Sequence, residues 1–256
     1  MIKLGIKHPF SHLPVFFYPE AESTMDCAQE LYIRYKTSGI IAAAGHQKSG
    51  RGRVPSRKWF DVPNSALLCT LVMQANQLEF PVSQLPLRCG LGIADFIQEF
   101  VPEADVEIKW PNDVLVGGRK ICGILCESRG EAVYAGFGIN CRRQELLPEE
   151  FGRKQPVSLE ELGLFLDSPL SVLGNVLEHL HKAFQRMDWK RALENKLYGI
   201  GDRVRFLPGK AAEYGFGGKD GSVVEGKLVG VDEYGGLQIH ENIHDSVTVW
   251  YAGELI

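Results

Sequence analysis

Five basic side chains lie within the segment from residue 47 to residue 60, and no acidic residue follows until Asp61. Residues 50–53 read Gly-Arg-Gly-Arg, and Arg57, Lys58 and Trp59 come soon after. Glycine lets a backbone approach a ligand closely, and arginine offers a rigid fork for phosphate or carboxylate oxygens. One interpretation is therefore a loop that folds over a small anionic ligand. A solvated basic loop or a nucleic-acid patch is the alternative, and the spacing of a P-loop is absent.

A second group of residues with chemical potential is Lys109-Trp-Pro-Asn-Asp113, between two expected strands. Asn and Asp at the end of a strand commonly form turn hydrogen bonds, which is the purely structural interpretation. The functional interpretation is that Asn112 and Asp113 bind a ligand. In that case Asp113 is the candidate for a magnesium ion, which takes carboxylate oxygens together with substrate phosphates.

Lys120 lies in an otherwise apolar run, Lys-Ile-Cys-Gly-Ile-Leu. An unpaired ammonium group is costly to bury, so this side chain either reaches solvent at a sheet edge or points at an anionic or carbonyl group in a pocket. Gly123 in the same run permits a close backbone approach. A lysine beside an acyl phosphate would stabilise the charge that develops on reaction. The Gly136-Phe-Gly138 that follows is a weak nucleotide signal, because the full dinucleotide fingerprint is absent.

Regular elements are expected on both sides of these motifs. Ser23 is a good N-cap for a helix whose apolar residues run to Tyr35, and a second helix is expected up to about Phe100. Pro169 to Leu197 is predicted to be one long helix, with Met187 on its buried side. Gly117-Gly118 is a hairpin signal. The strands expected before that long helix are 40–44, 65–73, 106–110, 114–116, 120–126 and 132–139.

The character of the sequence changes after residue 200. Short apolar runs at 204–206, 222–231, 237–239 and 247–251 alternate with Gly and Asp turns, which favours a small barrel. The sequence therefore predicts an α+β domain over residues 1–199, a mixed β-sheet with flanking helices, and a C-terminal domain over residues 200–256.

Composition narrows the class of protein. The chain has 256 residues, a net charge of −4 and a pI near 6.0, whereas a general nucleic-acid binder is usually basic. No run of about 18 apolar residues and no apolar signal-peptide stretch occurs, so a cytoplasmic protein is expected. None of the six cysteines forms a Cys-x-x-Cys pair, and we expect reduced, structural cysteines.

The motifs gain their meaning from their order. Glu22-Ser-Thr24, then Gln47-x-x-Gly-Arg-Gly-Arg53, then Lys109–Asp113, then Arg119-Lys-x-x-Gly-Ile-Leu-x-Glu127, then Gly138-Ile-Asn140 resembles the biotin–protein ligases. The resemblance covers residues 18–142 well. It implies a catalytic domain similar to class II aminoacyl-tRNA synthetases, and the C-terminal segment looks like the SH3-like β-barrel of the same family.

The resemblance also implies roles for individual residues. Lys120, Arg51 and Asp113 match the catalytic positions, and Asp113 is also the implied magnesium ligand. The chain has Met25 where the family often has Asn after Ser-Thr, and its spacing before Trp59 is longer than is common. The residues that match positions binding biotin or its adenylate are Ser23, Thr24, Met25, Gln47, Arg51, Gly52, Arg53, Trp59, Asn112, Lys120, Gly123 and Asn140.

The activity implied by the resemblance is ATP-dependent formation of biotinyl-5'-AMP, followed by transfer of biotin to a lysine of a biotin carboxyl carrier protein. Biotin and the ATP–Mg2+ complex are then substrates, and no permanently bound cofactor is expected. We expect no nucleic-acid or membrane partner. The sequence is compatible with a monomer and with a homodimer. Because the first motif begins at Glu22, the enzyme-only type without a DNA-binding domain is expected. The alternatives are a lipoate–protein ligase and a non-catalytic biotin-binding sensor.

Overall fold

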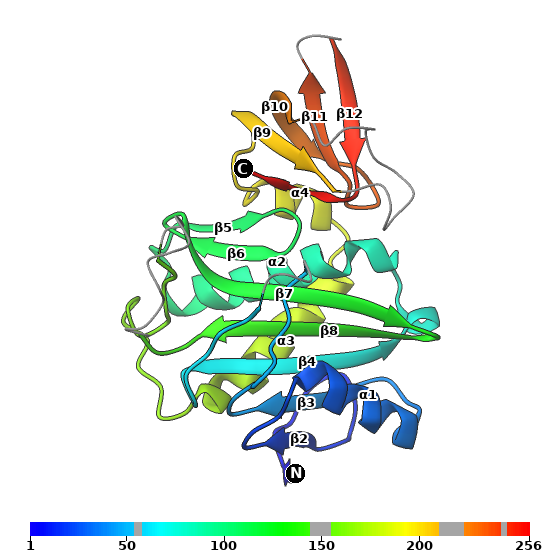
Figure 1. The fold of residues 1–256 in the computed structure, drawn as a ribbon, viewed down its shortest axis with the longest axis vertical. Coiled ribbons are helices and arrows are strands. Elements are labelled where there is room, and N and C mark those ends of the chain that lie inside the picture. The colour runs from blue at the N-terminus through cyan, green and yellow to red at the C-terminus, as the bar shows by residue number, and fades with distance from the viewer. Residues whose placement is uncertain (54–57, 144–154, 210–222, 242–244) are drawn as a thin grey trace.

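The computed structural model describes residues 1–53, 58–143, 155–209, 223–241 and 245–256. The chain forms two β-sheets, and helices pack on the larger one (Figure 1). The hydrogen-bonded order of the larger sheet is β1-β2-β3-β4-β8-β7-β6-β5. Its strands are β1 (Ile2–Leu4), β2 (Val15–Tyr18), β3 (Ile40–Ala44), β4 (Ala66–Gln74), β5 (Val106–Lys109), β6 (Asp113–Val116), β7 (Arg119–Arg129) and β8 (Ala132–Asn140).

The larger sheet is mixed, as predicted. β2 and β3 are parallel, with Phe16 opposite Ala42, and the other neighbouring strands are antiparallel. A parallel pair needs a crossover connection, and here the helix α1 (Thr24–Tyr35) supplies it. The Oγ atom of Ser23 accepts a hydrogen bond from the backbone N of Met25, which confirms Ser23 as the N-cap of this helix.

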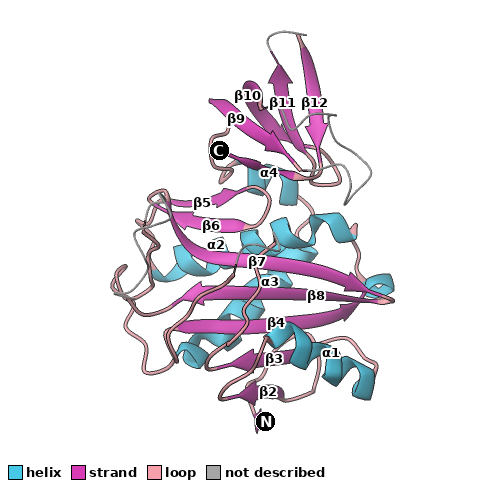
Figure 2. Cartoon of the chain, viewed as in Figure 1, coloured by secondary structure: helices cyan, strands magenta, loops and turns pink. Residues whose placement is uncertain are grey.

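The two faces of the sheet are covered differently, because side chains alternate along each strand. In β3, Ile41 and Ala43 belong to the core under α2 (Leu85–Phe100) and α3 (Leu173–Gln185), whereas Ile40 and Ala42 belong to a smaller cluster under α1. In Figure 2 α1 lies in front of the sheet, and α2 and α3 lie behind it. α1 packs mainly on β3, β4 and β8, and a cleft lies in front of β7 and β8 beside it.

The prediction of one long helix from Pro169 to Leu197 was wrong. The segment consists of the 3-10 turn η4 (Pro169–Val172), α3, and the short helix α4 (Trp189–Glu194). Arg186 adopts an extended conformation that ends α3, and the chain turns so that Trp189 enters the core. Met187, expected on the buried side, is 95% exposed at this break. Two further 3-10 turns, η1 (Ala75–Gln77) and η2 (Val82–Gln84), precede α2.

The C-terminal residues form a second sheet of short strands, as the alternation of apolar runs and turns predicts. Its order is β12-β11-β10-β9-β13, and within the described residues it is an open five-stranded sheet, because β12 and β13 do not pair. The strands are β9 (Arg203–Pro208), β10 (Val224–Val231), β11 (Leu237–Glu241), β12 (Ser246–Trp250) and β13 (Gly253–Leu255).

The small sheet packs directly on the rest of the chain. Its Phe206 and Ile239 belong to the same core cluster as the residues of α2 and α3. The indole N–H of Trp110 donates to the carbonyl oxygen of Gly235 at 2.9 Å, and Gln84 Nε2 donates to the carbonyl oxygen of Glu233 at 2.7 Å. The turn between β5 and β6 and the 3-10 turn η2 before α2 are therefore fixed against the turn between β10 and β11. None of the helices in the described ranges is long and apolar enough to cross a membrane.

Candidate active site

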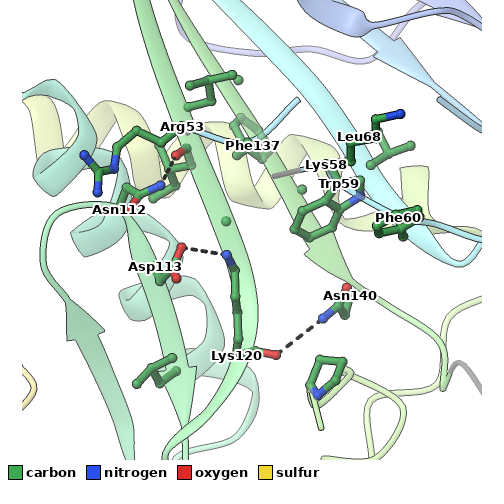
Figure 3. Close-up of a pocket in the computed structure, with 18 of the residues that line it drawn as sticks. Arg53, Lys58, Trp59, Phe60, Leu68, Asn112, Asp113, Lys120, Phe137 and Asn140 are labelled. Atoms are coloured by element: carbon green, nitrogen blue, oxygen red, sulfur yellow. Dashed lines mark hydrogen bonds and ion pairs between the residues drawn. The ribbon is translucent and has the colours of Figure 1, made fainter. Parts of the chain in front are cut away.

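A cleft of about 1300 Å³ lies on the front of β7 and β8. It brings together the residues that the resemblance assigns to catalysis and to binding, although these come from five separate stretches of the chain (Figure 3). The predicted residues that line it are Ser23, Thr24, Met25, Gln47, Arg51, Gly52, Arg53, Trp59, Asn112, Asp113, Lys120, Gly123 and Asn140.

The floor of the cleft is a pair of glycines. Gly123 of β7 lies opposite Gly138 of β8 in the strand register, and the indole ring of Trp59 rests on both. A methyl group placed on Gly138 would meet ring atoms of Trp59 at 2.6 Å, so no other residue fits there without moving the ring. The indole N–H is buried and makes no hydrogen bond to a described residue, which leaves a donor for a ligand.

Lys120 reaches the cleft because of a β-bulge. The register between β6 and β7 shifts from Val114 opposite Cys122 to Leu115 opposite Lys120, so Ile121 is the extra residue. A bulge changes the face to which the following side chains point. Lys120 thus shares the face of Gly123, where the missing side chain leaves room for its chain of methylenes.

The Lys120 ammonium lies 2.7 Å from Oδ1 of Asp113, the first residue of β6 (Figure 3). Oδ1 is buried, and the contact lacks the angles of a well-formed hydrogen bond, so it is an ion pair held mainly by charge. Of the two interpretations of this lysine, the structure supports the pocket rather than the sheet edge. The pair puts a cation within the cleft next to the Trp59 ring.

The end of the cleft near α1 is lined by hydrogen-bonding side chains. Gln47 Oε1 accepts from the backbone N of Thr24 at 2.7 Å and from its hydroxyl at 3.1 Å. The hydroxyl of Thr70, which is fully buried on β4, donates to Thr24 Oγ1 at 2.9 Å. The Ser23 hydroxyl oxygen caps α1. The contacts from Thr70 to Thr24 and from Thr24 to Gln47 fix the orientation of the polar atoms of Thr24 and Gln47.

Met25 and Gly136 close the same end. A methyl group added to Gly136 would lie 2.9 Å from the Met25 sulfur and 3.4 Å from Thr70 Oγ1. The residue after Ser23-Thr24 is therefore an apolar wall, packed on Gly136, the first glycine of β8.

The two arginines of the Gly-Arg-Gly-Arg motif have different partners. Arg51 makes a bidentate contact with the carboxylate of Asp26 on α1, at 2.8 and 3.1 Å, and this contact raises the pKa of Arg51. Arg53 donates to the carbonyl oxygen of Gly253 in β13 at 2.7 Å. Gly52 lies between them on the cleft wall. The loop is thus joined to α1 on one side and to the small sheet on the other.

Asn112 and Asn140 make structural contacts with their amide groups. Asn112 Nδ2 donates to the backbone carbonyl oxygen of Ile124 at 2.7 Å, and the backbone carbonyl oxygen of Asn112 accepts from the backbone N of Ile124 at 2.9 Å. Asn140 Nδ2 donates to the carbonyl oxygens of Val157 and Lys120 at 3.2 and 3.4 Å. These amides hold the turn at Asp113 and the backbone of Lys120, which is the structural interpretation of the motif. Both residues also line the cleft.

Two contributors to the site were not expected from the sequence. Glu254 lines the cleft from the other sheet, and Thr70, in a strand that reads as apolar almost throughout, supports the cleft by donating to Thr24. Neither has a local signal, because only the tertiary fold brings them to the site. Within the described ranges, no group of three or more His, Cys, Asp or Glu side chains is arranged to hold a metal ion.

Comparisons with known proteins agree with this architecture. Residues 18–142 match the model of the biotin/lipoate A/B protein ligase family. The chain is 36% identical to the biotin–[acetyl-CoA-carboxylase] ligase of Paracoccus denitrificans, over 61% of this chain and 64% of that protein. It is 30% identical to the ligase of the same name from Mycobacterium tuberculosis, over 67% and 66% of the two chains.

The chain belongs to the biotin/lipoate A/B protein ligase family. The family predicted from the motifs is therefore confirmed. Among solved structures, this member is similar to the biotin protein ligase from Aquifex aeolicus in complex with biotin and ATP. The TM-score is 0.77 and the identity 27%, and the match covers 94% of this chain and 97% of the other.

Proposed function

We propose that this family member is a biotin–protein ligase, which activates biotin with ATP as biotinyl-5'-AMP and transfers the biotinyl group to a lysine of a carrier domain. The observation that carries the proposal is the assembly of the thirteen motif residues along one cleft. The names of the similar proteins, ligases that act on acetyl-CoA carboxylase, favour biotin over lipoate and favour catalysis over a binding sensor. The carrier domain of such a carboxylase is the proposed acceptor.

The polar end of the cleft is the proposed site for the head group of biotin. Gln47, Thr24 and Ser23 offer donors and acceptors there, and the Met25 side chain offers an apolar wall. The indole ring of Trp59, which rests on the glycine floor, offers a flat apolar surface against which the substrate would lie. The carboxyl group of the acid would then point toward Lys120.

In the first step, a carboxylate oxygen of biotin attacks the α-phosphorus of ATP and pyrophosphate leaves. Lys120 is the proposed group that offsets the negative charge gathering on the carboxylate and α-phosphate oxygens. The carboxylate of Asp113, 2.7 Å from the Lys120 ammonium, positions this ammonium before the substrates bind. Asp113 is also our proposed contact for the magnesium ion that accompanies ATP, because Mg2+ uses one or two carboxylates together with phosphates.

In the second step, the amine of the acceptor lysine attacks the carbonyl carbon of the mixed anhydride, and AMP leaves with the bonding electrons. Arg51 and Arg53 are the proposed cover of the adenylate, since the glycines beside them permit a close approach to phosphate oxygens. Enclosure keeps water from hydrolysing the intermediate before the acceptor arrives.

We further propose that residues 1–199 are a catalytic domain of the synthetase-like type and that residues 200–256 are the SH3-like domain of the family. The similarity to the Aquifex aeolicus protein over nearly the whole of both chains supports this division. The contact between Arg53 and Gly253 supports the proposal that the C-terminal domain lies beside the adenylate.

The test is an adenylation assay that offers biotin and lipoate separately. Pyrophosphate–ATP exchange that depends on biotin, together with a mass increase of one biotinyl group on a carrier domain, is the expected result. Exchange with lipoate alone would make the protein a lipoate ligase. Biotin binding with no exchange would make it a sensor.

A further inference from the structure

Asp61 is a buried carboxylate that the proposed chemistry does not use. Its side chain has no exposed surface. Oδ2 lies 2.8 Å from His46 Nδ1 and 3.4 Å from the backbone N of Gln47, whereas Oδ1 meets no donor among the described residues. Burial raises the pKa of Asp61, because a carboxylate is costly to remove from water. Among the described residues, Asp61 therefore acts on its surroundings only through the two contacts of Oδ2, with His46 and with the backbone N of Gln47.

These contacts close the base of the loop that carries Arg51 and Arg53, called the arginine loop below. Asp61 and His46 lie on the two limbs that lead into and out of the loop, and the limbs carry Gln47 and Trp59, both in the cleft. Backbone hydrogen bonds join the limbs on either side of the pair: Asn64 N to Gly45 O at 2.8 Å and Trp59 N to Gly50 O at 3.0 Å. The buried carboxylate is thus the side-chain link within a short ladder.

The orientation of Gln47 follows from its neighbour. The backbone N of Thr24 has only a proton to offer, so the amide atom 2.7 Å away must be the oxygen of Gln47. The amino group of Gln47 is then the atom left as a donor. A rotation of the Gln47 backbone would break both contacts with Thr24 and turn this donor away. The contact of Asp61 with the backbone N of Gln47, together with the backbone hydrogen bonds between the two limbs, opposes such a rotation.

We propose that Asp61 is a positioning residue that acts through His46 and the backbone of Gln47 to fix the Gln47 side chain against Thr24, and so sets the affinity for the head group of the substrate acid. Asp61 touches no substrate in this assignment. The inference rests on the proposed function, in which Gln47 faces the head group.

The first test measures KM and kcat for biotin in pyrophosphate exchange. Asp61→Ala is expected to raise KM for biotin tenfold to a hundredfold with kcat nearly unchanged, since a small misplacement of a binding group is enough for such a loss. Asp61→Asn keeps an oxygen that accepts from His46, so it should recover most of the affinity. Glu99→Gln is the matched control, because Glu99 pairs with His179 at 2.9 Å outside the cleft. It should leave both constants unchanged.

The second test asks whether Asp61 acts through Gln47. In a Gln47→Ala background, Asp61→Ala should raise KM by less than twofold, because the group that it positions is gone. An independent effect of the same size in both backgrounds would overturn the proposal. So would a change of kcat and KM together in Asp61→Ala while Asp61→Asn shows no recovery.

A third measurement separates this inference from the proposed function, because it needs no catalysis. In hydrogen exchange followed by mass spectrometry, Asp61→Ala should speed exchange in peptides spanning Gly45 to Gly50, whereas Asp61→Asn should do so much less and Glu99→Gln not at all. Unchanged exchange there in Asp61→Ala would defeat the inference even if the wild type ligates biotin. Conversely, a wild type without biotin-dependent exchange of pyrophosphate would defeat the proposed function, and faster amide exchange would still support Asp61 as the link that holds Gln47.

Discussion

Lys120 Nζ lies 2.7 Å from Asp113 Oδ1, across the register of β6 and β7, and this pair is formed inside the cleft rather than at the sheet edge. The relationship depends on the bulge at Ile121, which gives Lys120 and Gly123 the same face. It is therefore a product of strand irregularity as much as of residue type.

Lys120→Ala is expected to lower the rate of biotin-dependent pyrophosphate exchange about a hundredfold or more, because the charge that forms on the carboxylate and phosphate loses its nearest cation. The fold should survive, since the side chain is 40% exposed. Lys190→Ala is the matched control: Lys190 also forms an ion pair, with Glu233, but outside the cleft. Near-normal exchange in Lys120→Ala would remove this lysine from the reaction.

Gly138→Ala tests the glycine floor. The new methyl group would lie 2.6 Å from the Trp59 ring, so the ring must shift and the floor becomes uneven. We expect weaker biotin binding by calorimetry, by a factor of roughly ten or more. Gly5→Ala is the control, because nothing lies within 4 Å of the added atom there. Equal affinities for the two variants would show that the ring is free to adapt.

Arg88→Leu is expected to lower the free energy of unfolding by about 2–4 kcal/mol, because three hydrogen-bonded carbonyl groups lose a charged donor. Arg88 is 5% exposed, and its guanidinium donates to the carbonyl oxygens of Ala183, Phe184 and Arg186 at the end of α3. Burial lowers the pKa of Arg88 to about 10. Urea unfolding measures the loss. Arg191→Leu should cost less than about 1 kcal/mol, because Arg191 is 79% exposed in a surface ion pair.

Local patterns predicted the elements around the site well. The helix cap at Ser23 and the hairpin turn at Gly117-Gly118 each depend on only a few neighbouring residues. The break between α3 and α4 was missed because its cause is not local: Trp189 turns into the core, and Arg88, far away in sequence, contacts the carbonyl groups that end α3. A helical period read from sequence has no access to such a partner.

The same distinction applies to the cleft. The motif residues were identified by type and order, but the pairing of Arg51 with Asp26 depends on how α1 lies against the loop. The pairing of Arg53 with Gly253 joins the loop between β3 and β4 to the small sheet. The sequence showed which side chains carry charge, whereas the fold decides what each charge meets.

Cys27 is expected to react slowly with iodoacetamide although its side chain is partly exposed. Burial, with Glu30 and Asp26 nearby, raises the pKa of its thiol to about 11 from the usual 9.0. The thiolate fraction at pH 8 then falls about a hundredfold, and the thiolate is the reacting form. Mass spectrometry of native and urea-unfolded protein should show alkylation of Cys27 only after unfolding. Rapid labelling of Cys27 in the native protein at pH 8 would contradict the raised pKa.

Arg53→Ala is expected to make the enzyme release biotinyl-5'-AMP before transfer. The arginine is held 2.7 Å from the carbonyl oxygen of Gly253, so it lies between the loop and β13, on the wall of the cleft. Its loss removes a donor for the phosphate and also a link between the two sheets, so the cover of the adenylate opens more often. The free adenylate would then acylate lysines of unrelated proteins.

The measurement is biotin transfer to an added bystander protein, such as serum albumin, compared with transfer to the carrier domain. Arg53→Ala should increase the share of label on the bystander several-fold. Arg203→Ala is the control, because Arg203 is exposed on the same small sheet and pairs only with Glu225 among the described residues. If bystander labelling is equal in Arg53→Ala and wild type while adenylate forms normally, Arg53 does not cover the intermediate, and its bond to Gly253 serves only to dock the two sheets.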